Sequence, residues 1–68
     1  MHTFPKVLRE LREERKLSQT ELANKLGYKS ATVISNWELG IRTPELANLI
    51  TIADFFRVSI DYLIGREQ

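Results

Sequence analysis

The stretch SQTELANKLGYKSATVISNWE, residues 18–38, decides the fold. Ser18 with Glu21 three residues later forms a capping box, which predicts the start of a helix. Gly27 ends that helix in the way that glycine commonly does. After a short turn, Ser30 is the expected cap of a second short helix. Two short capped helices joined by a glycine turn have the layout of a helix-turn-helix, although a generic helical hairpin shares this pattern.

The two sides of the second short helix differ in character. At 100° per residue, Val33, Ile34 and Trp37 fall on one side and are expected to enter the core. The opposite side carries no charge, and its residues are Ala31, Thr32, Ser35 and Asn36. Exposed helix faces are normally rich in Lys, Glu and Arg, so an uncharged face indicates a surface that contacts something other than water.

The rest of the chain carries further helix signals and no alternation long enough to make a sheet. Gly40 ends the second short helix, and Thr43 with Pro44 indicates the start of the next helix. Ser59 is the expected cap of a short last helix, which Gly65 ends. The sequence predicts five helices, over about residues 4–15, 19–26, 31–38, 44–55 and 60–64. Besides the three residues above, the expected buried positions are Phe4, Leu8, Leu11, Leu22, Ala23, Leu26, Leu46, Leu49, Ile52, Ala53 and Phe56.

Length and composition indicate a single globular domain over residues 1–68, and the helix signals above make it an all-α domain. Apolar residues make up 43% of the chain and charged residues 28%, which is the balance of a folded protein. The lack of cysteine excludes a disulfide framework and a thiolate metal site. No apolar run approaches the roughly 20 residues that span a bilayer, and no signal-peptide core is present, so we expect a cytoplasmic protein.

Charge is distributed unevenly along the chain, although the net charge is only +1. Residues 1–42 carry eight Lys and Arg against five Glu, whereas residues 43–68 carry two Arg against four Asp and Glu. A basic first part suggests that one side of the protein meets an anion. A chance imbalance among a few surface charges would give the same distribution.

The sequence offers little for enzymatic chemistry, so we expect no enzyme, no cofactor and no metal. It has no glycine-rich phosphate loop and no paired base and nucleophile. His2 is the only histidine, and no second metal ligand follows it at helical or turn spacing.

Three spaced motifs resemble the Cro and phage-repressor type of helix-turn-helix domain, often called the xenobiotic-response-element family. They are LSQTELANKLG, ISNWELGIRTP and FFRVSIDYLIG, and the similarity covers about residues 4–65. The resemblance implies a five-helix, lambda-repressor-like DNA-binding domain that regulates transcription, most commonly as a repressor and as a homodimer on a palindromic operator. It places the second helix of the motif in the major groove of double-stranded DNA.

The resemblance also assigns roles to individual positions. The base-reading positions are Ala31, Thr32, Ser35 and Asn36, and Gln19 stands where relatives contact the DNA backbone. Lys29 and Arg42 flank the second short helix and, with Ser30, are also expected to lie next to the DNA backbone. The residue types suit these roles, because Asn pairs with adenine, Ser and Thr bond to several bases, and small methyl groups contact thymine. The resemblance further implies an ion pair between Arg12 and Glu38. It implies a dimer contact at Ile60 and Tyr62, with Phe55 a further candidate.

The chain departs from the family pattern at its turns. Two residues, Tyr28 and Lys29, separate the turn glycine from Ser30, where relatives usually have one. Lys16 and Arg57 stand where relatives often end a helix with Gly or Asn, so each is expected to carry a small strain. Two alternatives to a plain regulator stay open. One is an antitoxin-type regulator that binds its operator and a partner protein, and the other is a protein-interaction module that binds no DNA.

Overall fold

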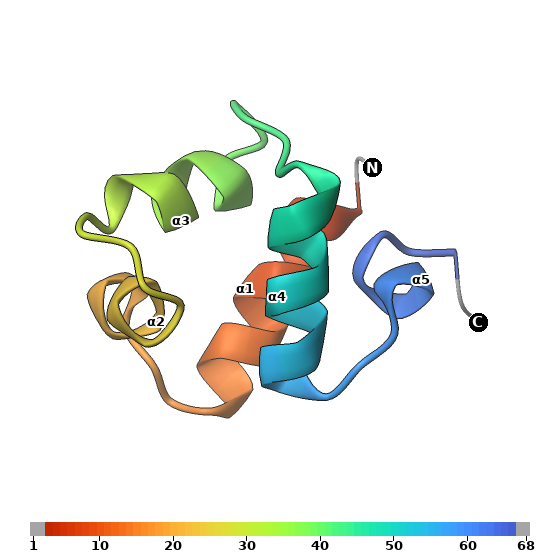
Figure 1. The fold of residues 1–68 in the computed structure, drawn as a ribbon, viewed down its shortest axis with the longest axis horizontal. Helices are drawn as coiled ribbons and strands as arrows, with labels where there is room; N and C mark the ends of the chain where they lie inside the picture. The colour runs from red at the N-terminus through yellow and green to blue at the C-terminus, as the bar shows by residue number, and fades with distance from the viewer. Residues whose placement is uncertain (1–2, 67–68) are drawn as a thin grey trace.

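The computed structural model describes residues 3–66, which form five α-helices and no strand (Figure 1). The helices are α1 (Phe4–Glu14), α2 (Gln19–Lys25), α3 (Thr32–Glu38), α4 (Leu46–Phe56) and α5 (Ile60–Leu63). The all-α prediction is confirmed, and the bounds of four helices lie within one residue of those expected. The start of α4 was predicted wrongly, by two residues.

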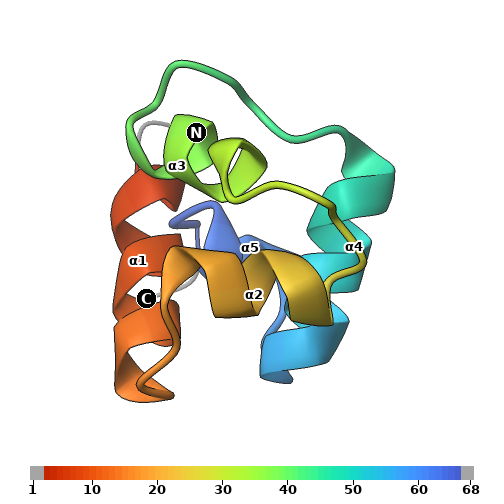
Figure 2. The ribbon, with the colours of Figure 1, turned by 90° about the vertical axis from the view of Figure 1, so that its left-hand side faces the viewer.

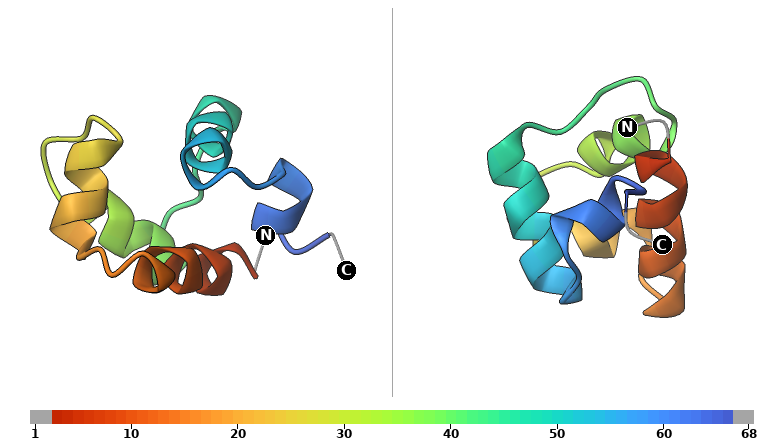
Figure 3. Two further views of the ribbon diagram at one scale, coloured as in Figure 1. Left: turned by 90° about the horizontal axis from the view of Figure 1, so that it is seen from below. Right: turned by 90° about the vertical axis from the view of Figure 1, so that its right-hand side faces the viewer.

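The helices surround one small core. Viewed toward α2 and α3, α1 and α4 stand on opposite flanks, α3 lies above α2 between them, and α5 lies behind (Figure 2). The views from below and from the other side place α1 and α4 across from each other as well (Figure 3). The α1 helix packs against α3 and α5, α2 packs against α3, and α4 packs against α5. The buried hydrophobic residues that form the core are Phe4, Leu8, Leu11, Leu22, Ala23, Ile34, Trp37, Leu49, Ile52, Ala53, Phe56 and Leu63.

The capping box at the start of α2 is formed as predicted. The Ser18 hydroxyl accepts the Glu21 backbone N–H at 3.0 Å, and the Glu21 carboxylate accepts the Ser18 backbone N–H at 2.8 Å. The Ser18 backbone N–H, as the larger cause, and the Ser18 side chain both favour the ionised carboxylate and lower the pKa of Glu21. The box therefore fixes where α2 begins, which sets the position of Gln19 in its first turn.

The start of α4 corrects the sequence prediction. Thr43 does not cap the helix and Pro44 is not its first residue, because Glu45 is still extended and Leu46 is the first helical position. Pro44 is buried beside Trp37, so packing rather than the local Thr-Pro signal decides the path of the chain here. Leu46 was expected in the buried stripe, but that prediction was wrong, because Leu46 is the first helical residue and is 65% exposed.

Two non-glycine residues take the left-handed conformation that the sequence led us to expect. Lys16 has φ 57° after α1, and Arg57 has φ 59° at the end of α4. Each residue carries a cost of about 1 kcal/mol relative to glycine, because its Cβ crowds the following carbonyl.

Candidate nucleic-acid interface

A buried ion pair joins α1 to the end of α3. Arg12 Nε lies 2.7 Å from one carboxylate oxygen of Glu38, and Arg12 Nη2 lies 3.0 Å from the other. The side chains are only 12% and 4% exposed. The Glu38 hydrogen bond is the largest cause of a raised pKa at Arg12, so the guanidinium stays charged. Arg12 Nη1 also donates to the Leu17 carbonyl at 2.8 Å, which ties the loop between α1 and α2 to this ion pair.

The first turn of α3 is held by a hydroxyl pair. Ala31 rather than the expected Ser30 directly precedes the first helical residue. The Ser30 hydroxyl nevertheless accepts the Thr32 backbone N–H at 3.1 Å and donates to the Thr32 hydroxyl at 3.0 Å. Ser30 therefore supplies the acceptor that the start of this helix needs, from one position further out than predicted.

The uncharged side of α3 is presented outward. Ile34 and Trp37 are buried on the inner side, whereas Thr32 is exposed and Ala31, Ser35 and Asn36 are half-buried. All four polar or small side chains expected to read bases thus lie on one side of a helix anchored from behind by the core. In Figures 1 and 2, α3 lies along an edge of the molecule, with α2 beneath it.

The residues expected near the DNA backbone lie in different settings. Lys29 and Arg42 are exposed and flank α3 at its two ends. The Asn36 carbonyl accepts the Arg42 backbone N–H at 3.3 Å, which keeps this arginine close to the last turn of α3. Gln19 is half-buried, and its amide nitrogen donates to Glu38 at 3.0 Å.

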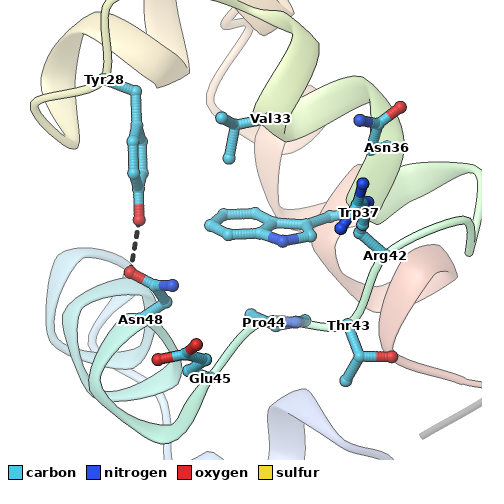
Figure 4. Close-up of a pocket in the computed structure, with 9 residues that line it drawn as sticks. All are labelled: Tyr28, Val33, Asn36, Trp37, Arg42, Thr43, Pro44, Glu45 and Asn48. Atoms are coloured by element: carbon cyan, nitrogen blue, oxygen red, sulfur yellow. Dashed lines mark hydrogen bonds between the residues drawn. The ribbon is translucent and has the colours of Figure 1, made fainter.

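A cleft of about 370 Å³ separates the outer part of α3 from the start of α4 (Figure 4). Its lining residues are Tyr28, Val33, Asn36, Trp37, Arg42, Thr43, Pro44, Glu45 and Asn48. Tyr28 reaches from the turn across this cleft, and its hydroxyl donates to the Asn48 side-chain oxygen at 2.5 Å. Burial raises the pKa of Tyr28. The sequence reasoning did not single out Asn48, because nothing in the spacing of residues 28 and 48 signals a contact.

The residues expected at a dimer contact lie around the end of α4 and α5. Tyr62 is 41% exposed, and Ile60 and Phe55 are half-buried. The Phe55 ring packs edge-on against Phe56, and the Arg15 guanidinium lies 5.0 Å from its centroid. Phe55 therefore already has partners within the domain.

The comparisons with known proteins bear on this arrangement. A family model described as helix-turn-helix matches residues 8–63. The chain belongs to this family. Its α2–α3 unit is thus the helix-turn-helix of the Cro/C1 type, as the sequence resemblance indicated.

Several curated relatives are regulators by name. This helix-turn-helix domain is 42% identical over 65 residues to the HTH-type transcriptional activator BcrR of Enterococcus faecalis, covering 96% of this chain and 31% of that protein. It is 38% identical over 65 residues to the uncharacterized HTH-type transcriptional regulator YqaE of Bacillus subtilis (strain 168), covering 96% and 55%. It is 36% identical over 65 residues to the cryptic phage CTXphi transcriptional repressor RstR of Vibrio cholerae, covering 96% and 58%. The chain therefore spans less than two thirds of the length of each of these relatives. No solved structure matches it.

The family and the names of the relatives point to a DNA-binding regulator rather than to an enzyme. Within residues 3–66, no three His, Cys, Asp or Glu side chains are arranged to hold a metal ion. His2 lies outside the described residues. None of the helices formed by residues 3–66 is long and apolar enough to cross a membrane.

Proposed function

We propose that this helix-turn-helix domain binds double-stranded DNA in a sequence-specific manner, with α3 in the major groove. The observation that carries the proposal is the uncharged outer face of α3 between two exposed basic residues, Lys29 and Arg42. Base edges are read by short donors and acceptors, whereas phosphates are met by Lys and Arg. A helix with hydroxyls, an amide and a methyl group in its middle and positive charge at its ends suits both tasks.

The individual contacts follow from this orientation. Thr32, Ser35 and Asn36 contact base edges, and Ala31 contacts a thymine methyl group. Lys29, Arg42, Ser30 and the first turn of α2 with Gln19 contact the phosphates on either side. The α3 helix is suited to this task because the buried Arg12–Glu38 pair and the core fix it from behind.

We further propose that the domain acts as a repressor and binds as a homodimer to a palindromic operator. A domain that occupies promoter DNA blocks transcription without any contact to the polymerase, and the relative RstR is a repressor by name. The relative BcrR is an activator by name. A promoter–reporter fusion therefore measures directly whether this domain represses or activates transcription. Expression of the domain should lower reporter output, and an increase would contradict repression.

A dimer would place two recognition helices about 34 Å apart, one turn of DNA. Ile60 and Tyr62 are the leading contact residues for such a dimer, with Phe55 secondary because Arg15 and Phe56 already cover its ring. Sedimentation with and without a symmetric DNA site tests this assembly. We expect two chains per site, and a strict one-to-one complex would contradict it.

The decisive experiment separates base reading from phosphate contact. On DNA from upstream of the protein's own coding region, Asn36→Ala should weaken binding by about 1–3 kcal/mol. Binding to scrambled DNA should weaken far less, and the slope of log affinity against log salt should stay unchanged. Lys29→Ala should weaken binding to both DNAs by similar factors and reduce the slope of log affinity against log salt by about 1. If Asn36→Ala retains the wild-type ratio of specific to non-specific affinity, α3 does not read bases through this face.

A further inference from the structure

The side of α3 that faces α4 is supported differently from its other sides. Toward α1 and α2, the helix is held by the packed core and by the Arg12–Glu38 pair. Toward α4 it is bordered by the cleft of about 370 Å³, which packed side chains do not fill. The connection between α3 and α4 closes one end of this cleft, and Tyr28 spans the other end (Figure 4).

Tyr28 links three parts of the molecule. It belongs to the turn between α2 and α3, its ring packs edge-on against Trp37 of α3 with centroids 5.6 Å apart, and its hydroxyl donates to Asn48 of α4. Trp37 itself is 4% exposed and also packs edge-on against Phe4 of α1. The Tyr28 ring thus rests on a fixed surface, and the hydroxyl adds a directed contact to a separate helix.

We propose that the Tyr28–Asn48 hydrogen bond is a positioning contact that fixes the orientation of α3 and thereby sets its sequence specificity. This inference rests on the proposed function of α3. Base-edge hydrogen bonds need donor and acceptor to meet within a few tenths of an ångström, whereas phosphate contacts through long basic side chains tolerate a change of tilt. If α3 holds the reading orientation for only part of the time, its apparent affinity for the operator is the intrinsic affinity multiplied by that fraction.

The position of Tyr28 explains why this turn needs such a contact. Tyr28 and Lys29 together extend the turn that follows Gly27, and Lys29 is exposed. The backbone N–H of Tyr28 is bonded to the Ala23 carbonyl at 2.8 Å, so the residue is anchored to α2 as well. A lengthened turn gives α3 more freedom relative to α2, and the bond to α4 removes it.

The test uses Tyr28→Phe, which keeps the ring and removes only the hydroxyl, and Asn48→Ala, which removes the acceptor. Operator and scrambled DNA are titrated at a temperature where every variant is fully folded. Both variants should lower the ratio of specific to non-specific affinity by about threefold to tenfold, the factor that one neutral hydrogen bond contributes to an equilibrium constant. The double variant should lose no more than either single variant, because the two groups act through one bond.

Two further variants separate positioning from general stability. Asn48→Asp keeps an acceptor for the Tyr28 hydroxyl and, unlike Asn48→Ala, should keep the wild-type ratio of specific to non-specific affinity. The added negative charge should weaken binding to both DNAs. Asn24→Ala removes an exposed asparagine of α2 and should leave the ratio unchanged. If Tyr28→Phe keeps the wild-type ratio of specific to non-specific affinity, the proposal is overturned. This holds even if Asn48→Ala lowers the ratio, because the two residues would then not act through one bond.

A DNA-free measurement keeps the inference separate from the proposed function. Residual dipolar couplings of the wild type and Tyr28→Phe report the angle between α3 and α4 in solution. We expect this angle to change, and an unchanged angle would overturn the positioning role. If the wild type shows no preference for any DNA sequence, the proposed function fails, while the couplings still decide whether Tyr28 orients α3.

Discussion

Replacing Arg12 by alanine is the sharpest perturbation of this small domain. The guanidinium makes two bonds to Glu38, of 2.7 and 3.0 Å, and the Glu38 side chain is only 4% exposed. In Arg12→Ala the carboxylate keeps Gln19 as its one side-chain donor and loses its opposite charge. An uncompensated buried charge of this kind costs about 3–5 kcal/mol.

That cost is large for a chain of this size. A domain of 68 residues has a free energy of unfolding of roughly 3–10 kcal/mol. Each 1 kcal/mol corresponds to about 4–8 °C in melting temperature for a domain of 60–100 residues. We therefore expect Arg12→Ala to melt at least about 12 °C below the wild type, or to be unfolded at room temperature.

The same helix supplies a matched control. Arg9 pairs with Glu13 one turn away at 3.2 Å, but these side chains are 65% and 54% exposed. Such a pair contributes about 0.3–0.5 kcal/mol, so Arg9→Ala should change the melting temperature by only a few degrees. Thermal unfolding followed by circular dichroism compares the two variants directly. Equal melting temperatures for Arg12→Ala and Arg9→Ala would refute the reasoning that burial makes the Arg12–Glu38 pair contribute more to stability than an exposed pair.

Three further outcomes are expected. Ser18→Ala removes a formed capping box and should lower the free energy of unfolding by about 1 kcal/mol in urea titrations. Gly65→Ala should destabilise more than Gly27→Ala: both glycines have positive φ, but a Cβ at position 65 would lie 1.9 Å from the Thr3 hydroxyl oxygen, whereas position 27 opens to space; a reversed order would contradict this. The raised pKa of Tyr28 means that the folded state binds the hydroxyl proton more tightly than the unfolded state does. The contribution of this proton to the free energy of unfolding is therefore complete below the unfolded pKa of about 10, and it is lost as pH rises from there through the higher folded pKa. Alkaline melting curves of Tyr28→Phe should therefore show a weaker loss of stability above about pH 10 than those of the wild type.

Local chemistry explains why much of this fold was predictable from the sequence. The capping box at Ser18 and the glycine after α2 each act within a few residues, so the sequence contains the complete signal. The buried stripe of α1 follows from helical periodicity alone. The Arg12–Glu38 pair is different: its partners are 26 residues apart, and only the family resemblance connected them.

Contacts between distant segments limited the prediction elsewhere. The Thr43–Pro44 signal for a helix start was wrong because Pro44 is buried beside Trp37, and that tertiary packing outweighs a local preference. Tyr28 and Asn48 lie 20 residues apart, one in a turn and one on a helix with few polar residues. No periodicity or motif joins such positions, so their contact emerges only once α3 and α4 are placed in space.

Gln19 shows how the structural centre of the domain and its proposed DNA surface can share one side chain. A carboxamide nitrogen carries two N–H donors, and Glu38 accepts from Gln19 at one of its oxygens. In the proposed complex, the second N–H would donate to a phosphate while the bond to Glu38 persists. Binding of DNA at the first turn of α2 would therefore leave the buried pair with Arg12 intact. The ion pair with Arg12 holds Glu38, and Glu38 in turn holds the Gln19 amide. If the proposed DNA contact is correct, this chain of bonds would fix the donor that Gln19 offers to a phosphate at the start of α2.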